Sequence, residues 1–199
     1  MIKVDEREMR NVLLNRLATY KDCYLYEEYT IPSGKARADI IAVNGHVIAY
    51  EIKSDYDSLK RLSSQILEYD STFEMNYIVT GEKFIREVRR IVPSYWGIVL
   101  IKKNEKGLIS IKFERRAKLN PALDFESFIG LLSAEEIKKI ALNQPNIIQK
   151  YSKLQIRKYF KQDLVKLLNN TLSIKYKNEI KNHIRNTLKD KSLMCFSHK

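Results

Sequence analysis

Two acidic residues and one lysine stand out in adjacent apolar segments of the chain. Glu51 and Lys53 flank Ile52 in "AYEIKS", residues 49–54, and Asp39 lies inside "ADIIAV", residues 38–43. In a β-strand, residues i and i+2 share a face, so Glu51 and Lys53 stand side by side. A buried carboxylate such as Asp39 is costly unless it is paired or binds a cation. These three residues therefore form a candidate site.

The tripeptide Glu-Ile-Lys occurs three times, and its context separates the copies. The copy that contains Glu136 follows Ser133 at the spacing of a helical capping box, and the copy that begins at Glu179 also falls in a predicted helix. In a helix, residues i and i+2 point about 200° apart, so those pairs cannot share one site. Only the copy at Glu51 lies in a predicted strand.

The turn between the two apolar segments decides whether Asp39 meets Glu51. Asn44-Gly45 is a strong hairpin signal. A two-residue turn at Asn44-Gly45 would place Asp39 opposite Tyr50. A turn with an odd number of residues, with Gly45 in the left-handed region, or a bulge near the acids would place Asp39 opposite Glu51. We predict the second register, which puts Asp39, Glu51 and Lys53 on one face.

Two carboxylates beside a lysine have the chemistry of a site for a hard cation. Mg²⁺ and Mn²⁺ prefer oxygen ligands, and such a cation lowers the pKa of water and polarises a phosphate oxygen. Lys53 could position the attacking water or offset charge on the phosphate. The alternative is a purely structural ion pair across the hairpin.

The surrounding pattern predicts an α/β (α+β) fold that positions this hairpin near the centre of a sheet. We expect a helix over residues 5–19, strands over 23–31 and in 36–54, a helix over 57–73, a strand over 75–81, a helix over 82–92, and strands over 95–102 and 107–114. After Asn120-Pro121 the pattern is only helical, with helices over 133–142, 147–168 and 173–189. This change predicts a core over residues 1–119 and a helical C-terminal region over 120–199.

The net charge of +12 is concentrated in that C-terminal region, where 15 basic residues accompany 7 acidic ones. A polyanion is the expected partner, and DNA is the most common candidate, although a partner protein or an anionic membrane surface would also fit. We predict an amphipathic helix with a basic face, and a second basic patch near the site at Lys60 and Arg61. The basic face consists of Lys150, Lys153, Arg157, Lys158 and Lys161.

The N-terminal sequence "MIKVDEREMR" is charged, and no apolar segment reaches the length of a membrane span. Two cysteines and three histidines show no metal-ligand spacing. We therefore expect a soluble, cytoplasmic protein that does not act in a membrane.

The segment "RADIIAVNGHVIAYEIKS" resembles the core motif of the PD-(D/E)XK nuclease superfamily, in which an Asp precedes a hairpin and a Glu-x-Lys. Gln65 and Tyr69 in "RLSSQILEYD" are similar to the Gln-x-x-x-Tyr element of its RecB-like branch, and positions i and i+4 share a helix face. The string "YEIKSDYDSLKRLSSQILEYDSTF", with Trp96-Gly97, also resembles a group of small uncharacterised bacterial and phage proteins placed in that superfamily. The resemblance covers about residues 1–120.

The resemblance implies a restriction-endonuclease-like fold, a mixed sheet flanked by helices, and a set of site residues. Asp39, Glu51 and the backbone carbonyl of Ile52 would hold the metal, and Lys53 would serve the water. Gln65 would support the site, with Tyr69 on the same helix face.

The superfamily often supplies one more acid. Glu8 or Glu6 of the first helix is one candidate, and Glu28 on the preceding strand is another. Ala38 stands where some members have Pro. Asp55 and Asp57 are further candidate ligands, but we expect one of them to cap the helix that starts near Ser58.

The resulting expectation is a Mg²⁺- or Mn²⁺-dependent nuclease that hydrolyses DNA without strong sequence specificity. One alternative is a nucleic-acid-binding module on a nuclease fold with latent or lost catalysis. Another is a protein-interaction module with a structural ion-pair cluster. A homodimer and an unidentified protein partner also fit the sequence. The sequence does not identify the structure of the substrate or the biological pathway.

Overall fold

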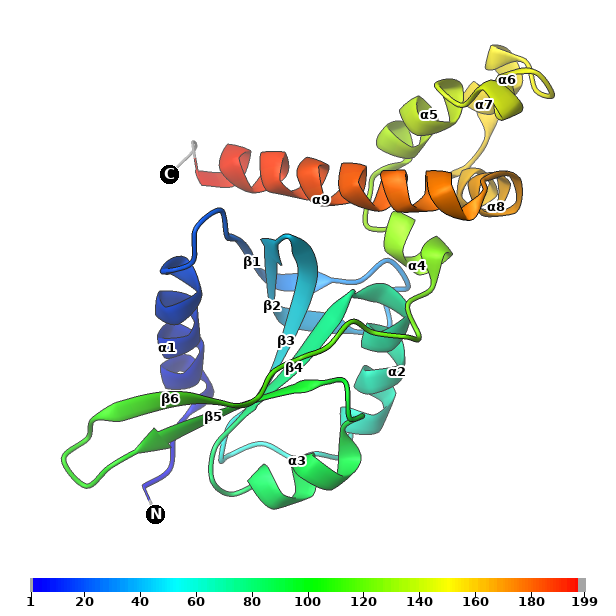
Figure 1. Ribbon diagram of the computed structural model, residues 1–199. Helices are drawn as coiled ribbons and strands as arrows, with labels where there is room; N and C mark the ends of the chain where they lie inside the picture. The colour runs from blue at the N-terminus through cyan, green and yellow to red at the C-terminus, as the bar shows by residue number, and fades with distance from the viewer. Residues whose placement is uncertain (1, 197–199) are drawn as a thin grey trace. The chain divides into compact units, whose positions relative to one another are not determined.

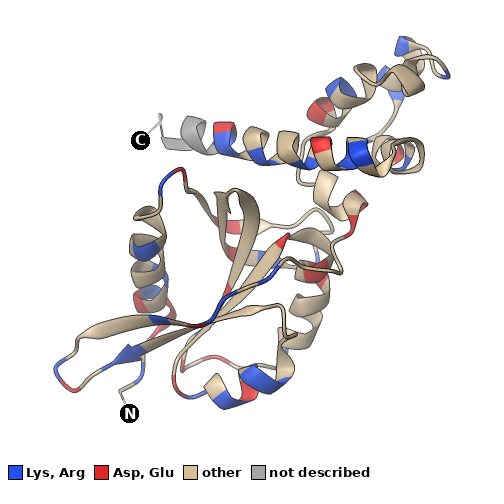
Figure 2. Cartoon of the chain, viewed as in Figure 1, with Lys and Arg blue, Asp and Glu red and all other residues tan. Residues whose placement is uncertain are grey.

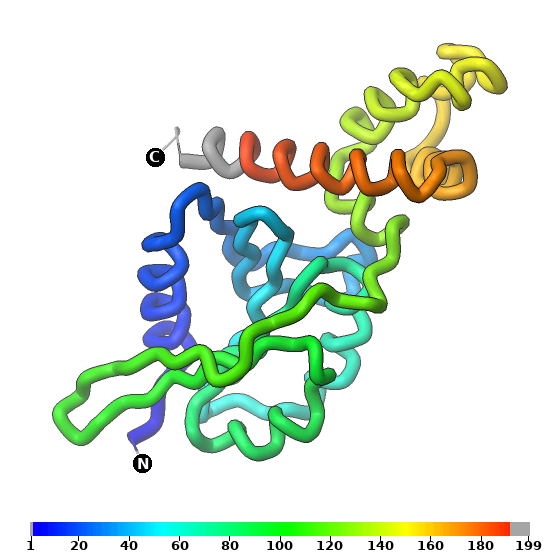
Figure 3. The backbone as a smooth tube through the Cα atoms, viewed as in Figure 1, coloured from blue at the N-terminus to red at the C-terminus, as the bar shows by residue number. Residues whose placement is uncertain are grey.

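The computed structural model describes residues 2–196, and the side chains of residues 2–191. The chain forms two compact units, Met1–Leu123 and Asp124–Lys199. Figure 3 traces the backbone through both units in chain order. The predicted domain boundary after residue 119 lies close to the end of the first unit.

The first unit is a six-stranded mixed sheet flanked by helices, and it confirms the predicted α/β fold class (Figure 1). The strands are ordered β1-β2-β3-β4-β5-β6 across the sheet. The elements are α1 (Glu6–Ala18), β1 (Tyr24–Thr30), β2 (Arg37–Asn44), β3 (His46–Lys53), α2 (Leu62–Thr72), β4 (Met75–Thr80), α3 (Ile85–Ile91), β5 (Gly97–Lys103) and β6 (Ile109–Arg115).

Connection lengths explain the mixed pairing. Short connections without a helix join β1 to β2, β2 to β3 and β5 to β6, and each of these pairs is antiparallel. The helices α2 and α3 are the crossovers that make β3–β4 and β4–β5 parallel. The centre of the sheet is consequently buried on both faces, and β4 is apolar through most of its length.

Alternating residues of the central strands face different helices. Met9, Leu13 and Leu17 of α1 pack in one cluster with Ile40 and Tyr50. The intervening residues of β2 and β3, Asp39 and Glu51 among them, point to the opposite face. In Figure 1, α1 and α2 lie on opposite sides of the sheet. The hairpin therefore presents its acids away from the α1 core.

The second unit contains helices only within its described residues, and basic residues recur along its last helix (Figure 2). Its helices are α4 (Phe125–Ile129), α5 (Ala134–Leu142), α6 (Pro145–Ile148), α7 (Lys153–Lys158), α8 (Lys161–Thr171) and α9 (Ile174–Phe196). The predicted single helix over 147–168 is wrong. It is interrupted by a new N-cap at Ser152, in a capping box with Gln155, and by extended backbone at Tyr159 and Phe160.

The described residues contain no candidate membrane-spanning helix. None of the helices there combines the length and the apolar composition needed to cross a bilayer.

Candidate active site

The β2–β3 hairpin has the register that the sequence predicted. Ile40 pairs with Tyr50 and Asn44 with His46, so the turn is centred on Gly45, which has a φ of +70°. One residue beyond the last ladder pair, Asp39 lies next to β3. Its Oδ2 accepts a hydrogen bond of 2.6 Å from the backbone N–H of Ile52. The Asp39 carboxylate thus accepts the Ile52 N–H in place of a backbone carbonyl of the ladder. This hydrogen bond holds the carboxylate beside Glu51.

Glu51 is buried, with 2% of its surface exposed, and three side chains hydrogen-bond to its carboxylate. The Lys53 ammonium and the Gln65 amide each donate to Oε1 over 2.5 Å. The Tyr69 hydroxyl lies 2.5 Å from Oε2 and 2.9 Å from the carbonyl oxygen of Arg37. These contacts fix the orientation of the carboxylate and provide the partners that a buried charge requires.

The helix α2 brings Gln65 and Tyr69 to the same carboxylate because they are four residues apart on one face. Burial, together with the charge of Glu51, raises the pKa of Tyr69 well above its ordinary value, so its hydroxyl stays a hydrogen-bond donor. The carbonyl oxygen Oε1 of Gln65 is buried without a hydrogen-bond partner among the described residues. Such an orphaned acceptor beside two carboxylates is expected to meet a donor or a hydrated cation.

Asp39 has a raised pKa of about 7. The largest cause is its burial, and the next is the negative charge of Glu51. The Ile52 N–H, Arg10 and Lys53 act in the opposite direction and do not cancel those effects. Burial and the neighbouring Glu51 therefore disfavour the charged form of Asp39, and a bound divalent cation would favour it.

Arg10 of α1 lies among four carboxylates, one of them that of Glu27 at 3.8 Å, and the sequence did not predict these contacts. Its guanidinium is 2.6 Å from Glu6, 2.6 Å from Glu28 and 3.4 Å from Asp39 Oδ1. It also donates to the Asp39 carbonyl oxygen over 2.8 Å. The spacing of Glu6 and Arg10, i and i+4, was the available signal for the first of these pairs.

The extra acids near Asp39 are Glu6 and Glu28, whose carboxylate oxygens lie within 4.8 Å of one another and of an Asp39 oxygen. Glu8 is directed elsewhere, because it forms a capping box with Asp5 and an ion pair with Lys103. Of the candidates named from the sequence, Glu8 is thus excluded by geometry.

Glu28 also has a backbone feature that is unusual for a residue other than glycine. Its φ is +52°, although it lies within strand β1. Residues held in this sparsely populated region cluster at functional sites. Its carboxylate bridges Arg10 and Arg37, so this strained residue is tied to the acids on both sides.

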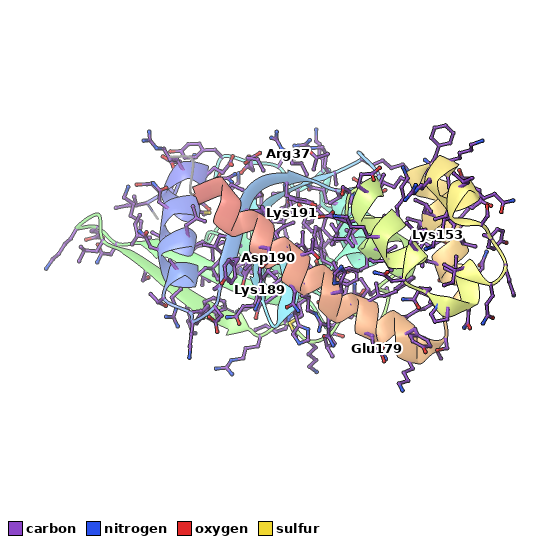
Figure 4. The ribbon with its side chains drawn as sticks, turned by 90° about the horizontal axis from the view of Figure 1, so that it is seen from above. Arg37, Lys153, Glu179, Lys189, Asp190 and Lys191 are labelled. Carbon is purple, nitrogen blue, oxygen red and sulfur yellow. The ribbon has the colours of Figure 1, made fainter. Side chains whose placement is uncertain are left out.

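These groups line one cavity of about 260 Å³. Asp39, Glu51 and Lys53 form its interior, and exposed basic side chains stand at its edge. These basic residues are Lys35, Arg37 and Arg61. Arg37 is labelled in Figure 4. An anionic substrate would meet cations before it reached the carboxylates.

The donor set fits Mg²⁺ or Mn²⁺. The carboxylates of Asp39 and Glu51 line the same cavity, and oxygens of Glu6, Glu28 and Asp39 lie within 4.8 Å of one another. Ile52, whose carbonyl is the predicted backbone ligand, is one of the residues that line the same cavity. A hard cation with several retained waters suits these oxygen donors.

Asp55 and Asp57 have other roles. Asp55 is buried and accepts hydrogen bonds from the N–H groups of Val4 and Lys83. Asp57 accepts from both the N–H and the hydroxyl of Ser54. The expectation that one of them caps α2 is wrong, because α2 begins at Leu62 with no side-chain cap. Through these hydrogen bonds, Asp55 links the chain after β3 to the segments that contain Val4 and Lys83.

Most of the residues predicted to contact nucleic acid are exposed, whereas one of them is hydrogen-bonded within the protein. Lys60 is exposed, and Arg61 is exposed at the cavity edge. In the second unit, an exposed set without ion pairs among the described residues consists of Lys150, Lys153, Arg157 and Lys158. Figure 4 labels Lys153 on α7. Lys161 does not belong to this set, because its ammonium donates to the Gly130 carbonyl over 2.6 Å and burial lowers its pKa.

Comparison with known proteins gives a family match over nearly the whole chain. The family described as "Bacteriophage P4 protein cII" matches residues 2–198. Protein cII of Enterobacteria phage P4 is 33% identical over 145 residues, which cover 71% of this chain and 54% of that protein. The chain spans about half the length of this relative.

Among solved structures, a protein of unknown function from Silicibacter pomeroyi matches with a TM-score of 0.41 and 16% sequence identity. The match covers 59% of this chain and 75% of that one.

Proposed function

The chain belongs to the bacteriophage P4 protein cII family, and we propose that it is a divalent-metal-dependent nuclease that hydrolyses phosphodiester bonds in DNA without strong sequence specificity. The observation that carries this proposal is the convergence of Asp39, Glu51 and Lys53 in one cavity. The likeness of these residues to the PD-(D/E)XK motif supports the same reading.

Asp39, Glu51 and the carbonyl of Ile52 are the groups that would hold Mg²⁺ or Mn²⁺, with Glu6 or Glu28 as a further ligand. A divalent cation at such a site lowers the pKa of water and stabilises charge that develops on the phosphate.

The chain's own residues supply positioning and charge. Gln65 and Tyr69 hold Glu51 from two sides and keep its carboxylate in one orientation. The Lys53 ammonium is only 7% exposed and lies beside Glu51, where it can orient a water molecule or offset charge on the phosphate. The exposed cations at the cavity edge draw the substrate backbone toward these groups.

A second candidate function is favoured by Arg10. Its guanidinium already compensates Glu6, Glu28 and part of Asp39. An ion-pair cluster of this kind suits a nucleic-acid-binding module whose catalysis is latent or lost. The same cluster would serve a protein-interaction module in which the acids are structural.

Metal-dependent cleavage distinguishes these functions. The experiment measures cleavage of labelled single-stranded and duplex DNA, and of RNA, with Mg²⁺, with Mn²⁺ and with EDTA. Lys53→Ala and Glu51→Gln should each reduce the rate by at least about a hundredfold. Glu105→Gln, which changes an exposed acid in the β5–β6 turn, is the matched control and should cleave at the parent rate.

DNA binding is measured in EDTA for the same proteins. Metal-dependent cleavage that is lost in both site variants, with binding retained, supports the nuclease. Binding without cleavage by the parent protein on every substrate would favour the latent module. The absence of both would favour the protein-interaction role.

A further inference from the structure

A second cavity, of about 540 Å³, lies in the first unit on the sheet face that α1 covers. Tyr50 contributes to its lining, and the neighbouring Glu51 points to the opposite face. The cavity is therefore separated from the carboxylate site by the sheet itself. Its volume is in the range of pockets that hold small organic ligands.

Aromatic rings form much of its lining. The rings of Tyr50 and Tyr77 are stacked, with centroids 4.9 Å apart and planes 8° apart. Phe113 meets Tyr77 edge to face at 5.8 Å, and Tyr20 adds a fourth ring that is 38% exposed. Tyr50 and Tyr77 are 3% and 9% exposed, so Tyr20 is the ring of this set that is most open to a planar ligand.

The sequence provides the space for this arrangement at Gly97 of β5. A Cβ atom built on Gly97 would lie 2.0 Å from Cε1 of Tyr77. The absence of a side chain at that position lets the Tyr77 ring lie across the neighbouring strand. The aromatic surface thus depends on one glycine in the middle of the sheet.

The charges around the cavity are of one sign. Arg16 and Arg116 line it, and none of the described lining residues is acidic. The Arg16 guanidinium lies over the Tyr20 ring, 5.0 Å from its centroid. Arg116 is exposed and makes no ion pair among the described residues. A ligand that enters would therefore be favoured if it carried negative charge.

Polar groups are also available inside. The hydroxyls of Tyr50 and Tyr77 have no hydrogen-bond partner among the described residues, and the amide of Asn44 lies in the same lining. These are donors and acceptors of the kind that recognise the edge of a heterocycle.

We propose that this cavity binds a nucleotide unit, with its base against Tyr20, Tyr50, Tyr77 and Phe113 and its phosphate at Arg16 and Arg116. The rings match a planar base, the arginines match a phosphate, and the volume accommodates both. The nucleotide comes either as a free nucleoside monophosphate or as the terminal nucleotide of a single strand. The site is independent of the carboxylate cavity and does not need its metal.

Calorimetric titration of the full chain in EDTA tests this proposal. The probes are adenosine 5′-monophosphate, adenosine, inorganic phosphate, and a short single-stranded oligonucleotide with a 5′-phosphate. Adenosine 5′-monophosphate should bind at one site per chain, more tightly than adenosine or phosphate alone, and oligonucleotide binding is assigned to this cavity where Arg116→Ala and Tyr20→Ala weaken it. Binding of the monophosphate identifies a free nucleotide as sufficient, whereas binding of only the oligonucleotide identifies a strand end.

Variants locate the bound nucleotide. Arg116→Ala should weaken binding by about tenfold, because it removes a charge-assisted contact to phosphate. Tyr20→Ala should weaken it by about fivefold or more, because base stacking is lost. Arg90→Ala, an exposed arginine of α3, is the control and should bind as the parent does.

The proposal is overturned if no probe binds, or if Arg116→Ala and Tyr20→Ala both bind like the parent. If the protein binds nucleotide here but never cleaves DNA, this binding site is supported and only the nuclease proposal is contradicted.

Discussion

The carboxyl group of Asp39 couples the candidate site to pH. Its pKa is raised from 3.8 to about 7, first by burial and then by the charge of Glu51. The folded chain therefore binds a proton more tightly than the unfolded chain does. Between about pH 4 and pH 7 the unfolded state loses this proton first, so the contribution of Asp39 to stability falls as pH rises.

Asp39→Asn should stabilise the metal-free protein at pH 8, and it should stabilise it less at pH 5. The neutral amide avoids the buried charge and the repulsion from Glu51, and its oxygen can still accept from the Ile52 N–H. We expect a gain of about 1–3 kcal/mol at pH 8, measured by urea unfolding in EDTA. A variant that was less stable than the parent at pH 8 would show that Arg10 outweighs burial and Glu51.

Arg10→Gln should weaken the fold and strengthen metal binding. The guanidinium now neutralises Glu6, Glu28 and Asp39, so its loss leaves these acids repelling one another, at a cost of about 1–3 kcal/mol. Mn²⁺ would then replace the missing positive charge. The urea midpoint should rise more with Mn²⁺ in this variant than in the parent.

Arg90→Gln provides the comparison for this experiment, because Arg90 is exposed and distant in sequence from the acids. Its response to Mn²⁺ should equal that of the parent. An equal response in Arg10→Gln would mean that the guanidinium does not compete with a cation for these carboxylates.

At the residue scale, the sequence predicted the contacts within the hairpin. It did not predict the contacts that reach the hairpin from α1. Asp39, Glu51 and Lys53 are brought together by strand alternation and register, which are local rules. Arg10 reaches Asp39 because of how α1 packs on the sheet. Amphipathic periodicity predicts the buried face of a helix but not the direction in which it crosses the sheet, so Glu6 and Glu8 could not be separated.

At the element scale, the β2–β3 hairpin sets the register on which the site depends. Gly45 has a φ of +70°, and a Cβ atom there would meet nothing within 4 Å. The requirement for glycine is therefore one of backbone conformation alone. This is why the dipeptide Asn44-Gly45 was informative before the structure was known.

Gly45→Ala should cost about 1–2 kcal/mol of unfolding free energy, because the left-handed region is unfavourable for a residue with a Cβ atom. Urea unfolding measures this cost. Gly45→Asn is the matched variant and should lose less, since asparagine tolerates this conformation. Equal stability of the parent and Gly45→Ala would show that the turn does not hold this conformation in solution.

Helix boundaries were predicted less well than strands, and the reason is local chemistry. The segment before α2 contains Asp55 and Asp57, which resemble caps, but Asp55 accepts from Val4 and Asp57 from Ser54, and the helix begins only at Leu62. In the second unit, Ser152 and Gln155 form a capping box inside a periodic apolar pattern. Periodicity alone continues through such a break, whereas the box marks a new helix start.

At the scale of the whole molecule, the candidate site residues and most of the net positive charge lie in different units. The carboxylate cavity is in Met1–Leu123, whereas residues 120–199 carry 15 basic and 7 acidic side chains. Charge counting identified the more basic part of the chain but not which of its cations are exposed and unpaired. Lys161 is engaged by Gly130, and this contact follows from the packing of α8 rather than from spacing in the sequence.

Replacing Lys150, Lys153, Arg157 and Lys158 together with Gln should weaken DNA binding and flatten its salt dependence. If these exposed cations contact phosphates, the slope of the logarithm of the binding constant against the logarithm of salt concentration should fall by about 2–4. Fluorescence anisotropy in EDTA at several salt concentrations measures it. The control replaces four exposed basic residues of the first unit, Arg86, Arg90, Lys106 and Lys118, and changes the net charge equally. A similar loss in both proteins would assign DNA binding to net charge rather than to the α6–α7 surface, whereas a loss confined to the first variant would locate the backbone contacts there.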